Sequence, residues 1–201
     1  MNDLLRSKAA GKPFLVLIVF CFVATAPSLV QARKYETVKL EISDAGTLVM
    51  KSESKCPMKT GRKPRPEFPE KGCIRAPEGE ALEVEFTLSG TKSNDACKKP
   101  QEYKLDGIQL GGKNGLKPTT AQWDNPTTLL DDEVQADFSV DSGSGWANFS
   151  TNANGNIVLE NNNESEDGYF FWYRVRATCS NPETPNTLYY DPRGDNEGAP
   201  N

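Results

Sequence analysis

Apolar residues alternate with polar residues over much of this chain, and a period of two predicts strands with one buried face. Residues 82–88 give the clearest example, because Glu83, Glu85 and Thr87 separate apolar positions. The same pattern predicts strands over residues 35–42, 47–50, 82–88, 103–110, 134–140, 156–159, 169–179 and 188–190. No stretch of ten or more residues has the i, i+3, i+4, i+7 apolar spacing of an amphipathic helix.

These short strands, separated by turn residues, predict an all-β fold: a single antiparallel β-sandwich of immunoglobulin-like or fibronectin-like type, stabilised by disulfides. Gly107 lies inside one strand and indicates a bulge there. Residues 173–177 read Tyr-Arg-Val-Arg-Ala and precede a polar turn and a last strand. This pattern resembles the final hairpin of fibronectin-type and immunoglobulin-like domains. The resemblance covers about 25 residues, and it implies the architecture without implying a function.

The N-terminus has the three parts of a secretory signal peptide. Basic residues precede the apolar run 14–24 and small residues follow it, so we expect cleavage after Ala32 or, alternatively, after Ala26. The apolar run is about half of the roughly 20 residues that a membrane-spanning helix needs. We therefore expect a signal peptide at 1–32, a β-sandwich domain at 33–192 and a disordered tail at 193–201, in a protein exported to a periplasm or to the extracellular space.

The charge of the chain limits its partners. The whole chain has 23 basic and 28 acidic residues, and residues 1–32 contain three of the basic ones and one of the acidic ones, so the mature chain has a formal charge of −7. A surface of this sign disfavours nucleic acid and anionic membranes as general partners. No transmembrane anchor is expected after cleavage of the signal peptide.

Four cysteines remain in the mature chain: Cys56, Cys73, Cys97 and Cys179. An even number in an exported chain predicts two disulfides, and four cysteines permit three pairings. We favour Cys56–Cys73, because the segment between them has little apolar content to hold it, and this leaves Cys97–Cys179. The sulfurs lack the paired spacing of a four-thiolate zinc site.

The chain contains no histidine. Mechanisms that need a Ser-His-Asp triad, a Cys-His pair or a His-ligated zinc ion are thereby excluded. We expect a protein that is not an enzyme, with no catalytic residues, no metal and no cofactor. Glycoside hydrolysis by two carboxylates is the one enzymatic alternative that we keep, in third place.

The loop from Cys56 to Cys73 is the most distinctive candidate for binding. Its five basic residues oppose only Glu67 and Glu70, and four prolines stiffen it. Arginine and lysine there suit a phosphate or carboxylate ligand. The candidate binding residues in this loop are Lys59, Arg62, Lys63, Arg65 and Lys71.

Aromatic residues supply two further candidates. Trp123 and Trp146 lie in polar surroundings, so we include both as candidate binding residues that would be partly exposed, although packing against the ends of the sandwich is the favoured interpretation. The run 169–173 (Tyr-Phe-Phe-Trp-Tyr) permits two interpretations. Either both sides of this strand are buried, which we favour, or one side forms a platform on which sugars stack.

Several shorter motifs are weaker. Acidic residues cluster at 131–133 and 161–167 and would suit Ca²⁺, although a solvated turn is the better interpretation. Sequons for N-glycosylation begin at Asn148 and Asn163. Residues 193–195, Arg-Gly-Asp, match the integrin-binding tripeptide and fall in the expected disordered tail.

These observations together predict an exported, non-catalytic recognition module that binds through loops at the ends of a β-sandwich. The partner would be a protein, a glycan or an anionic surface, with the 56–73 loop as the leading contact. The alternative is a structural or assembly subunit that associates with itself through exposed edge strands.

Overall fold

A computed structural model describes residues 32–52, 55–57, 71–90, 96–98, 102–111, 117–125, 132–141, 144–165, 168–179 and 186–197. The expected signal peptide lies almost wholly outside these residues. The strands are β1 (Arg33–Ile42), β2 (Leu48–Met50), β3 (Ile74–Ala76), β4 (Ala81–Ser89), β5 (Tyr103–Gly111), β6 (Ser150–Thr151), β7 (Ile157–Asn161), β8 (Tyr169–Cys179), β9 (Asn186–Tyr190) and β10 (Arg193–Asn196). The helices are α1 (Thr120–Asp124) and α2 (Asp132–Phe138).

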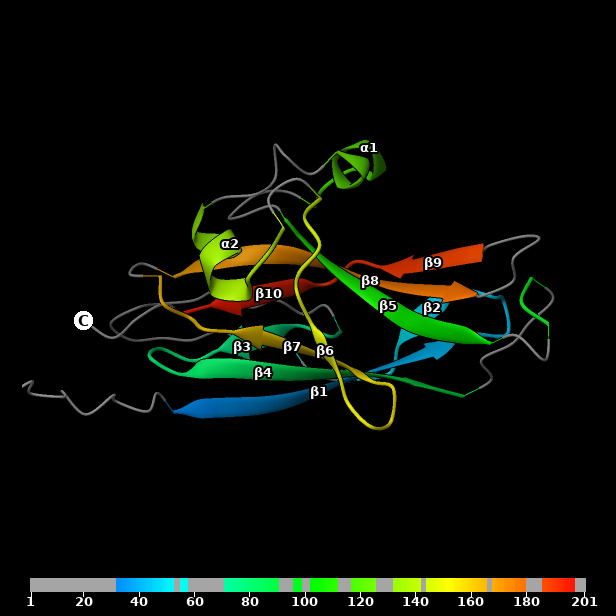
Figure 1. The fold of residues 1–201 in the computed structure, drawn as a ribbon, viewed down its shortest axis with the longest axis horizontal. Helices are drawn as coiled ribbons and strands as arrows, with labels where there is room; N and C mark the ends of the chain where they lie inside the picture. The colour runs from blue at the N-terminus through cyan, green and yellow to red at the C-terminus, as the bar shows by residue number, and fades with distance from the viewer. Residues whose placement is uncertain are drawn as a thin grey trace, which may run out of the picture. The chain divides into compact units, whose positions relative to one another are not determined.

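The strands form two sheets (Figure 1). The first has the order β2-β1-β4-β7-β6, and the second has the order β3-β10-β8-β5, with β9 also paired to β8. The pairs β1–β4 and β3–β10 are parallel. The expectation of purely antiparallel sheets is therefore wrong, because each sheet contains one parallel pair among antiparallel neighbours.

Strands β9 and β10 lie along the same side of β8. Tyr190 pairs with Val175 and Arg193 pairs with Trp172, so one register continues through both strands. Pro192 interrupts the ladder because proline has no N–H to donate. Its carbonyl still accepts a hydrogen bond of 3.0 Å from the backbone N–H of Tyr173.

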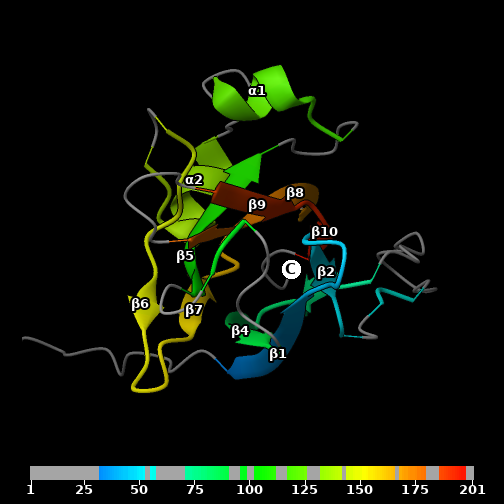
Figure 2. The same cartoon turned by 90° about the vertical axis from the view of Figure 1, so that its right-hand side faces the viewer.

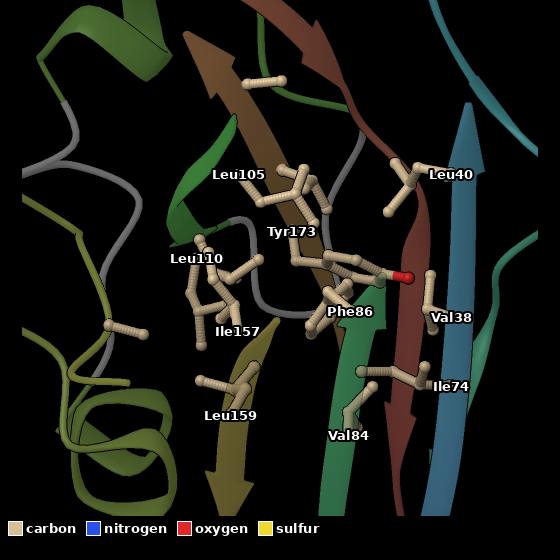
Figure 3. Packing of buried hydrophobic residues seen from close by; sticks show 14 of the residues in the cluster. Val38, Leu40, Ile74, Val84, Phe86, Leu105, Leu110, Ile157, Leu159 and Tyr173 are labelled. Carbon is tan, nitrogen blue, oxygen red and sulfur yellow. The ribbon is translucent and has the colours of Figure 1, made fainter. Parts of the chain in front are cut away.

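Buried side chains of both sheets belong to one hydrophobic cluster, which contains most of the core. Figure 3 shows Tyr173 of β8 among residues of β1, β4 and β7, beside Phe86. The rings of Tyr173 and Phe86 meet edge to face, with centroids 5.8 Å apart. Full burial of side chains of this size is the main favourable term in the folding of such a domain.

Both expected disulfides are present. Cys56 and Cys73 are bonded with their Cα atoms 5.6 Å apart, and Cys97 and Cys179 are bonded with theirs 5.8 Å apart. Two intramolecular disulfides are consistent with an oxidising compartment outside the cytoplasm. No helix in the described part of the chain is long and apolar enough to cross a membrane.

The predicted strand at 134–140 is wrong, because residues 132–138 form helix α2. Val134, Asp137 and Phe138 are buried, which is the i, i+3, i+4 spacing of one helix face. The apolar residues alone alternate with a period of two, and the third buried position is the acidic Asp137. A hydropathy pattern cannot show that an aspartate is buried.

The predicted disordered tail at 193–201 is wrong for its first part. Residues 193–196 form β10 between β3 and β8, and Asp195, Asn196 and Glu197 are buried. The segment is polar, and its burial depends on partners far away in the sequence. Residues 198–201 lie outside the described residues.

Candidate binding surface

The outward side of β8 carries an unusual series of side chains. Alternate residues of a strand point to opposite faces of the sheet, so Trp172, Arg174 and Arg176 share the face that points away from the core. Trp172 is 7% exposed and Arg174 is 6% exposed. Other segments cover this face, and Figures 1 and 2 both show α1 on that side of β8.

Arg174 is held between two aromatic rings. Its guanidinium carbon lies 4.7 Å from the centroid of Trp123 and 4.7 Å from the centroid of Tyr189. Nε of Arg174 donates a hydrogen bond of 2.8 Å to Oδ1 of Asp191. Stacking on aromatic faces and the bond to a carboxylate offset the cost of removing this guanidinium from water.

Helix α1 brings Trp123 to this position. Thr119 and Gln122 form a capping box that fixes the start of the helix. Nε2 of Gln109, on β5, donates to the carbonyl oxygens of Trp123 (2.7 Å) and Ser144 (3.0 Å). Trp123 is only 1% exposed. Trp123 therefore packs against the domain, which is the favoured interpretation, and the alternative of a partly exposed binding residue is wrong.

Arg176 makes a second stack one step along β8. Its guanidinium carbon lies 4.1 Å from the centroid of Trp146, and Nε donates a hydrogen bond of 2.8 Å to Oδ1 of Asp106. A Cβ atom at Gly107 would lie 2.6 Å from Cζ3 of Trp146. The ladder between β5 and β8 shifts register between Leu105 and Gly107, as expected for a bulge. The glycine at this bulge leaves room for the indole ring, and Trp146 itself is partly exposed.

The ring of Trp172 contacts two cationic side chains. The guanidinium carbon of Arg193 is 4.4 Å from its ring centroid, and Nζ of Lys117 is 5.8 Å from it. Nζ of Lys117 also lies 3.5 Å from Oδ2 of Asp191. The set formed by these stacks is called the arginine–aromatic face below. It consists of Trp123, Trp146, Trp172, Arg174, Arg176, Tyr189 and Arg193.

The disulfide at the base of the 56–73 loop lies beside this face. Phe170, the outward residue before Trp172 on β8, packs against the Cys56–Cys73 disulfide. Nη1 of Arg75 donates a hydrogen bond of 2.7 Å to the carbonyl oxygen of Pro57. Both ends of the loop are thus attached near the N-terminal end of β8.

The core also holds the end of this loop. The hydroxyl of Tyr173 donates a hydrogen bond to the carbonyl oxygen of Gly72. Burial raises the pKa of Tyr173 well above its ordinary value of 10.0, and the nearby Glu36 carboxylate raises it further. The neutral hydroxyl is the form that can donate this hydrogen bond.

The proposed binding residues of the loop are mostly outside the described part of the chain. Lys59, Arg62, Lys63 and Arg65 belong to residues that the structure does not describe. Lys71 is described and exposed. The charge of the loop is therefore known from its sequence, and the attachment of its ends is known from the structure.

The aromatic run on β8 is buried on both sides, which is the first of its two interpretations. Tyr169, Phe171 and Tyr173 are fully buried in the core. Phe170 packs on the disulfide and Trp172 is covered by Arg193. A flat platform of exposed rings for sugars is therefore absent from this described strand.

The polar residues near 161–165 serve the fold. Asn161, Asn163 and Ser165 are buried, and Glu164 donates a backbone hydrogen bond of 2.7 Å to Oδ1 of Asp137. Among the residues that the structure describes, no group of three cysteine or acidic side chains is placed to hold a metal ion. Asp131, Glu166 and Asp167 lie outside that part of the chain.

The Arg-Gly-Asp tripeptide lies within β10. Asp195 is 0% exposed, and its Oδ2 accepts a hydrogen bond of 2.6 Å from Nε of Arg75. Gly194 lies directly under the ring of Phe171. An integrin could not reach this aspartate in the folded protein.

The described surface contains hollows of a few hundred Å³. One of about 350 Å³ is lined by the end of β4, the start of β5 and the turn 153–156, and its lining contains no carboxylate. Another, of about 250 Å³, lies beside Phe149, and Glu160 is the acidic residue of its lining. Neither contains the two facing carboxyls that glycoside hydrolysis needs.

Comparisons of this chain with protein-family models, with curated proteins and with solved structures find no match.

Proposed function

We propose that this protein is an exported, non-catalytic recognition module that binds an anionic partner through the 56–73 loop. The observation that carries the proposal is the attachment of this loop: the Cys56–Cys73 disulfide joins its ends, and Phe170 packs against that disulfide. The two ends of the loop are thus fixed beside the arginine–aromatic face.

The charge of the loop supports an anionic partner. Between Cys56 and Cys73 five basic residues oppose two acidic ones, within a mature chain that is acidic overall. A basic segment on an acidic protein directs an anionic ligand to one place on the surface. Arginine and lysine both bind phosphate, sulfate and carboxylate groups through charge-assisted hydrogen bonds.

The fixed base reduces the cost of binding. Ordering a flexible loop on a partner opposes association, and restraint of the free loop lowers that cost. The disulfide, the bond from Arg75 to Pro57 and the bond from Tyr173 to Gly72 all restrain the loop ends before any partner arrives.

The arginine–aromatic face supplies a rigid support. Asp191 and Asp106 already pair with Arg174 and Arg176, so this face adds little free positive charge. Two exposed residues lie at this face: its member Tyr189, which is 45% exposed, and the neighbouring Lys117, whose side chain is 52% exposed. In the proposal these two residues contact the partner after the loop has bound.

The proposed protein is a β-sandwich that is exported from the cytoplasm. The two sheets, which share one hydrophobic cluster, form the layers of a β-sandwich with mixed strand directions. Residues 1–32 direct export and are removed. The two disulfides support this route, because such bonds persist in oxidising compartments.

A charge-matched pair of variants tests the proposal. In the first variant, Lys59, Arg62, Lys63, Arg65 and Lys71 are replaced by serine. In the control, five basic residues elsewhere are replaced by serine: Arg33, Lys39, Lys51, Lys98 and Lys104. Both variants of residues 33–201 are applied to immobilised heparin, a polyanion that presents sulfate and carboxylate groups, and eluted with salt.

We expect the loop variant to elute at a lower salt concentration than the control, since both have lost the same charge. Equal elution of the two variants would show that the loop has no special affinity for anions. Circular dichroism and a free-thiol assay confirm that each variant is folded with both disulfides formed.

A further inference from the structure

The two sequons of this chain lie in opposite environments. Asn148 begins Asn-Phe-Ser and is exposed, and Ser150 of the same motif is also exposed. Asn163 begins Asn-Glu-Ser and is 0% exposed. An N-linked glycan is bulky and hydrophilic, so it can occupy only a surface position.

The side chain of Asn163 is part of the fold. Its Nδ2 atom donates hydrogen bonds to the carbonyl oxygens of Pro77 (2.5 Å) and Glu80 (3.0 Å). Nδ2 is the atom to which a glycan is attached. A sugar on this atom would remove at least one of these bonds and would need space inside the packed protein.

The backbone around Asn163 is also fixed. The residue has a φ of 54°, in the left-handed region that asparagine tolerates better than most residues. Its backbone N–H donates a hydrogen bond of 2.8 Å to Oδ1 of Asn161. The next residue, Glu164, is bonded through its N–H to Asp137. The sequon therefore cannot swing outward without loss of several buried hydrogen bonds.

Asn148 has free space beside it. It lines the hollow of about 250 Å³ together with Phe138, Phe149 and Val158. Phe149 is 38% exposed, whereas Phe86, Phe138 and Phe171 are buried. A first sugar on Asn148 could cover part of this apolar surface.

We propose that the folded protein can carry an N-linked glycan at Asn148 and that a glycan at Asn163 excludes the native fold. The attachment transfers an oligosaccharide from a lipid diphosphate donor. A bond forms between Nδ2 of the asparagine and C1 of the first sugar, the bond from C1 to the diphosphate oxygen breaks, and the amide gives up one proton as the lipid diphosphate leaves.

The buried sequon at Asn163 limits the route by which the protein can be exported. Glycans are added to chains before they have folded, so burial in the native state does not protect Asn163 during synthesis. A secretory pathway with N-glycosylation would trap every chain that is modified at Asn163. Export through a pathway without N-glycosylation would avoid this loss.

Expression in a glycosylating host tests the proposal. Gln31–Asn201 forms one compact unit, so this part is fused to a host signal peptide and secreted from eukaryotic cells. Three chains are compared: the wild type, Ser165→Ala and Ser150→Ala. Removal of the glycan by an amidase in heavy-oxygen water marks each occupied asparagine, and mass spectrometry then locates it in the secreted and the retained protein.

Ser165→Ala is a suitable variant because it destroys the second sequon and leaves Asn163 in place. Oγ of Ser165 is buried and has no hydrogen-bond partner among the described atoms. Its replacement by alanine therefore costs the folded state little. Ser150→Ala is the matched control, since it removes the exposed sequon instead.

We expect secreted wild-type protein to carry a glycan at Asn148 and none at Asn163, with Asn163 occupied only in retained protein. Ser165→Ala should then be secreted in higher yield than the wild type, and Ser150→Ala should not. Secreted protein with native circular dichroism and a glycan at Asn163 would overturn the proposal. Native protein whose Asn148 is always unmodified would overturn its first half.

Discussion

Arg75 and Asp195 join two parallel strands that come from distant parts of the sequence. Nε of Arg75 donates a hydrogen bond of 2.6 Å to Oδ2 of Asp195, and the carboxylate side chain is 0% exposed. Glu197 lies near the same guanidinium, with Oε1 3.6 Å from Nε. The pair connects the C-terminal strand β10 to β3, and its burial makes the C-terminal strand part of the core structure.

The loss of this pair should destabilise the protein. Asp195→Asn removes the carboxylate closest to Nε of a largely buried guanidinium, and we expect the free energy of unfolding to fall by about 2 kcal/mol. Urea denaturation measures this change. Glu160→Gln makes the same chemical change at an exposed partner of Arg33, and it should have no measurable effect. Equal stabilities of the two variants would contradict the structural role of Asp195.

The sequence predicted the strands whose apolar residues face the core, because the alternation of these residues indicates which positions are buried. Strands β1, β4, β5, β7 and β8 all agree with the expected ranges within a few residues. The sequence did not predict β10, because Arg-Gly-Asp-Asn contains no apolar side chain to mark it. Its burial depends on Arg75, 120 positions away, and no local pattern contains that information.

The candidate site could also be predicted only in part from the sequence. The disulfides could be predicted by pairing the cysteines, and the structure confirms both. The arginine–aromatic face could not be predicted from the sequence. Arg174 meets Trp123 and Tyr189 only after three separate segments have come together. Arginine on alternate positions of an aromatic-rich strand was the one available indication.

Gly194 tests how tightly β10 is packed. A Cβ atom at this position would lie 2.1 Å from Cζ of Phe171, in the centre of the core. Gly194→Ala should therefore destabilise the protein by about 1–3 kcal/mol, the usual cost of overpacking. In a Phe171→Leu background the same substitution should cost less, since the ring that it meets is absent. A thermodynamic cycle from urea denaturation measures the difference, and strictly additive effects would argue against this contact.

Tyr173 should make the protein sensitive to alkaline pH. Its pKa in the folded state is raised well above 10.0. The unfolded chain loses the phenolic proton first, so the contribution of Tyr173 to stability is fully present below about pH 10 and is lost as the pH rises further. Tyr173→Phe should lower the free energy of unfolding by about 1 kcal/mol at neutral pH, because it removes the hydrogen bond to Gly72. Its stability should then fall less steeply than that of the wild type above pH 10, as measured by denaturation at a series of pH values. Parallel curves would show that Tyr173 is not responsible.

The two disulfides should contribute unequally. They close loops of 17 and 82 residues, and the chain-entropy model gives about 1.4 kcal/mol more for the longer loop. Denaturation of two double variants tests this, with alanine at positions 56 and 73 or at positions 97 and 179. The second variant should be the less stable. The first should keep its stability better but elute earlier from heparin, because its basic loop is no longer closed.

Arg174→Lys tests the arginine–aromatic face itself. Lysine keeps the charge but lacks the flat guanidinium that stacks between Trp123 and Tyr189 and bonds to Asp191. We expect a loss of about 1–2 kcal/mol, since a stacked, desolvated arginine is not replaceable by lysine. Tryptophan fluorescence should shift to longer wavelength as water reaches Trp123. Arg33→Lys is the control, because Arg33 pairs with Glu83 and Glu160 at an exposed site without a stacked ring. If both variants keep wild-type stability and emission, Arg174 does not hold α1 on β8, and the face cannot serve as the rigid support that the proposed function requires.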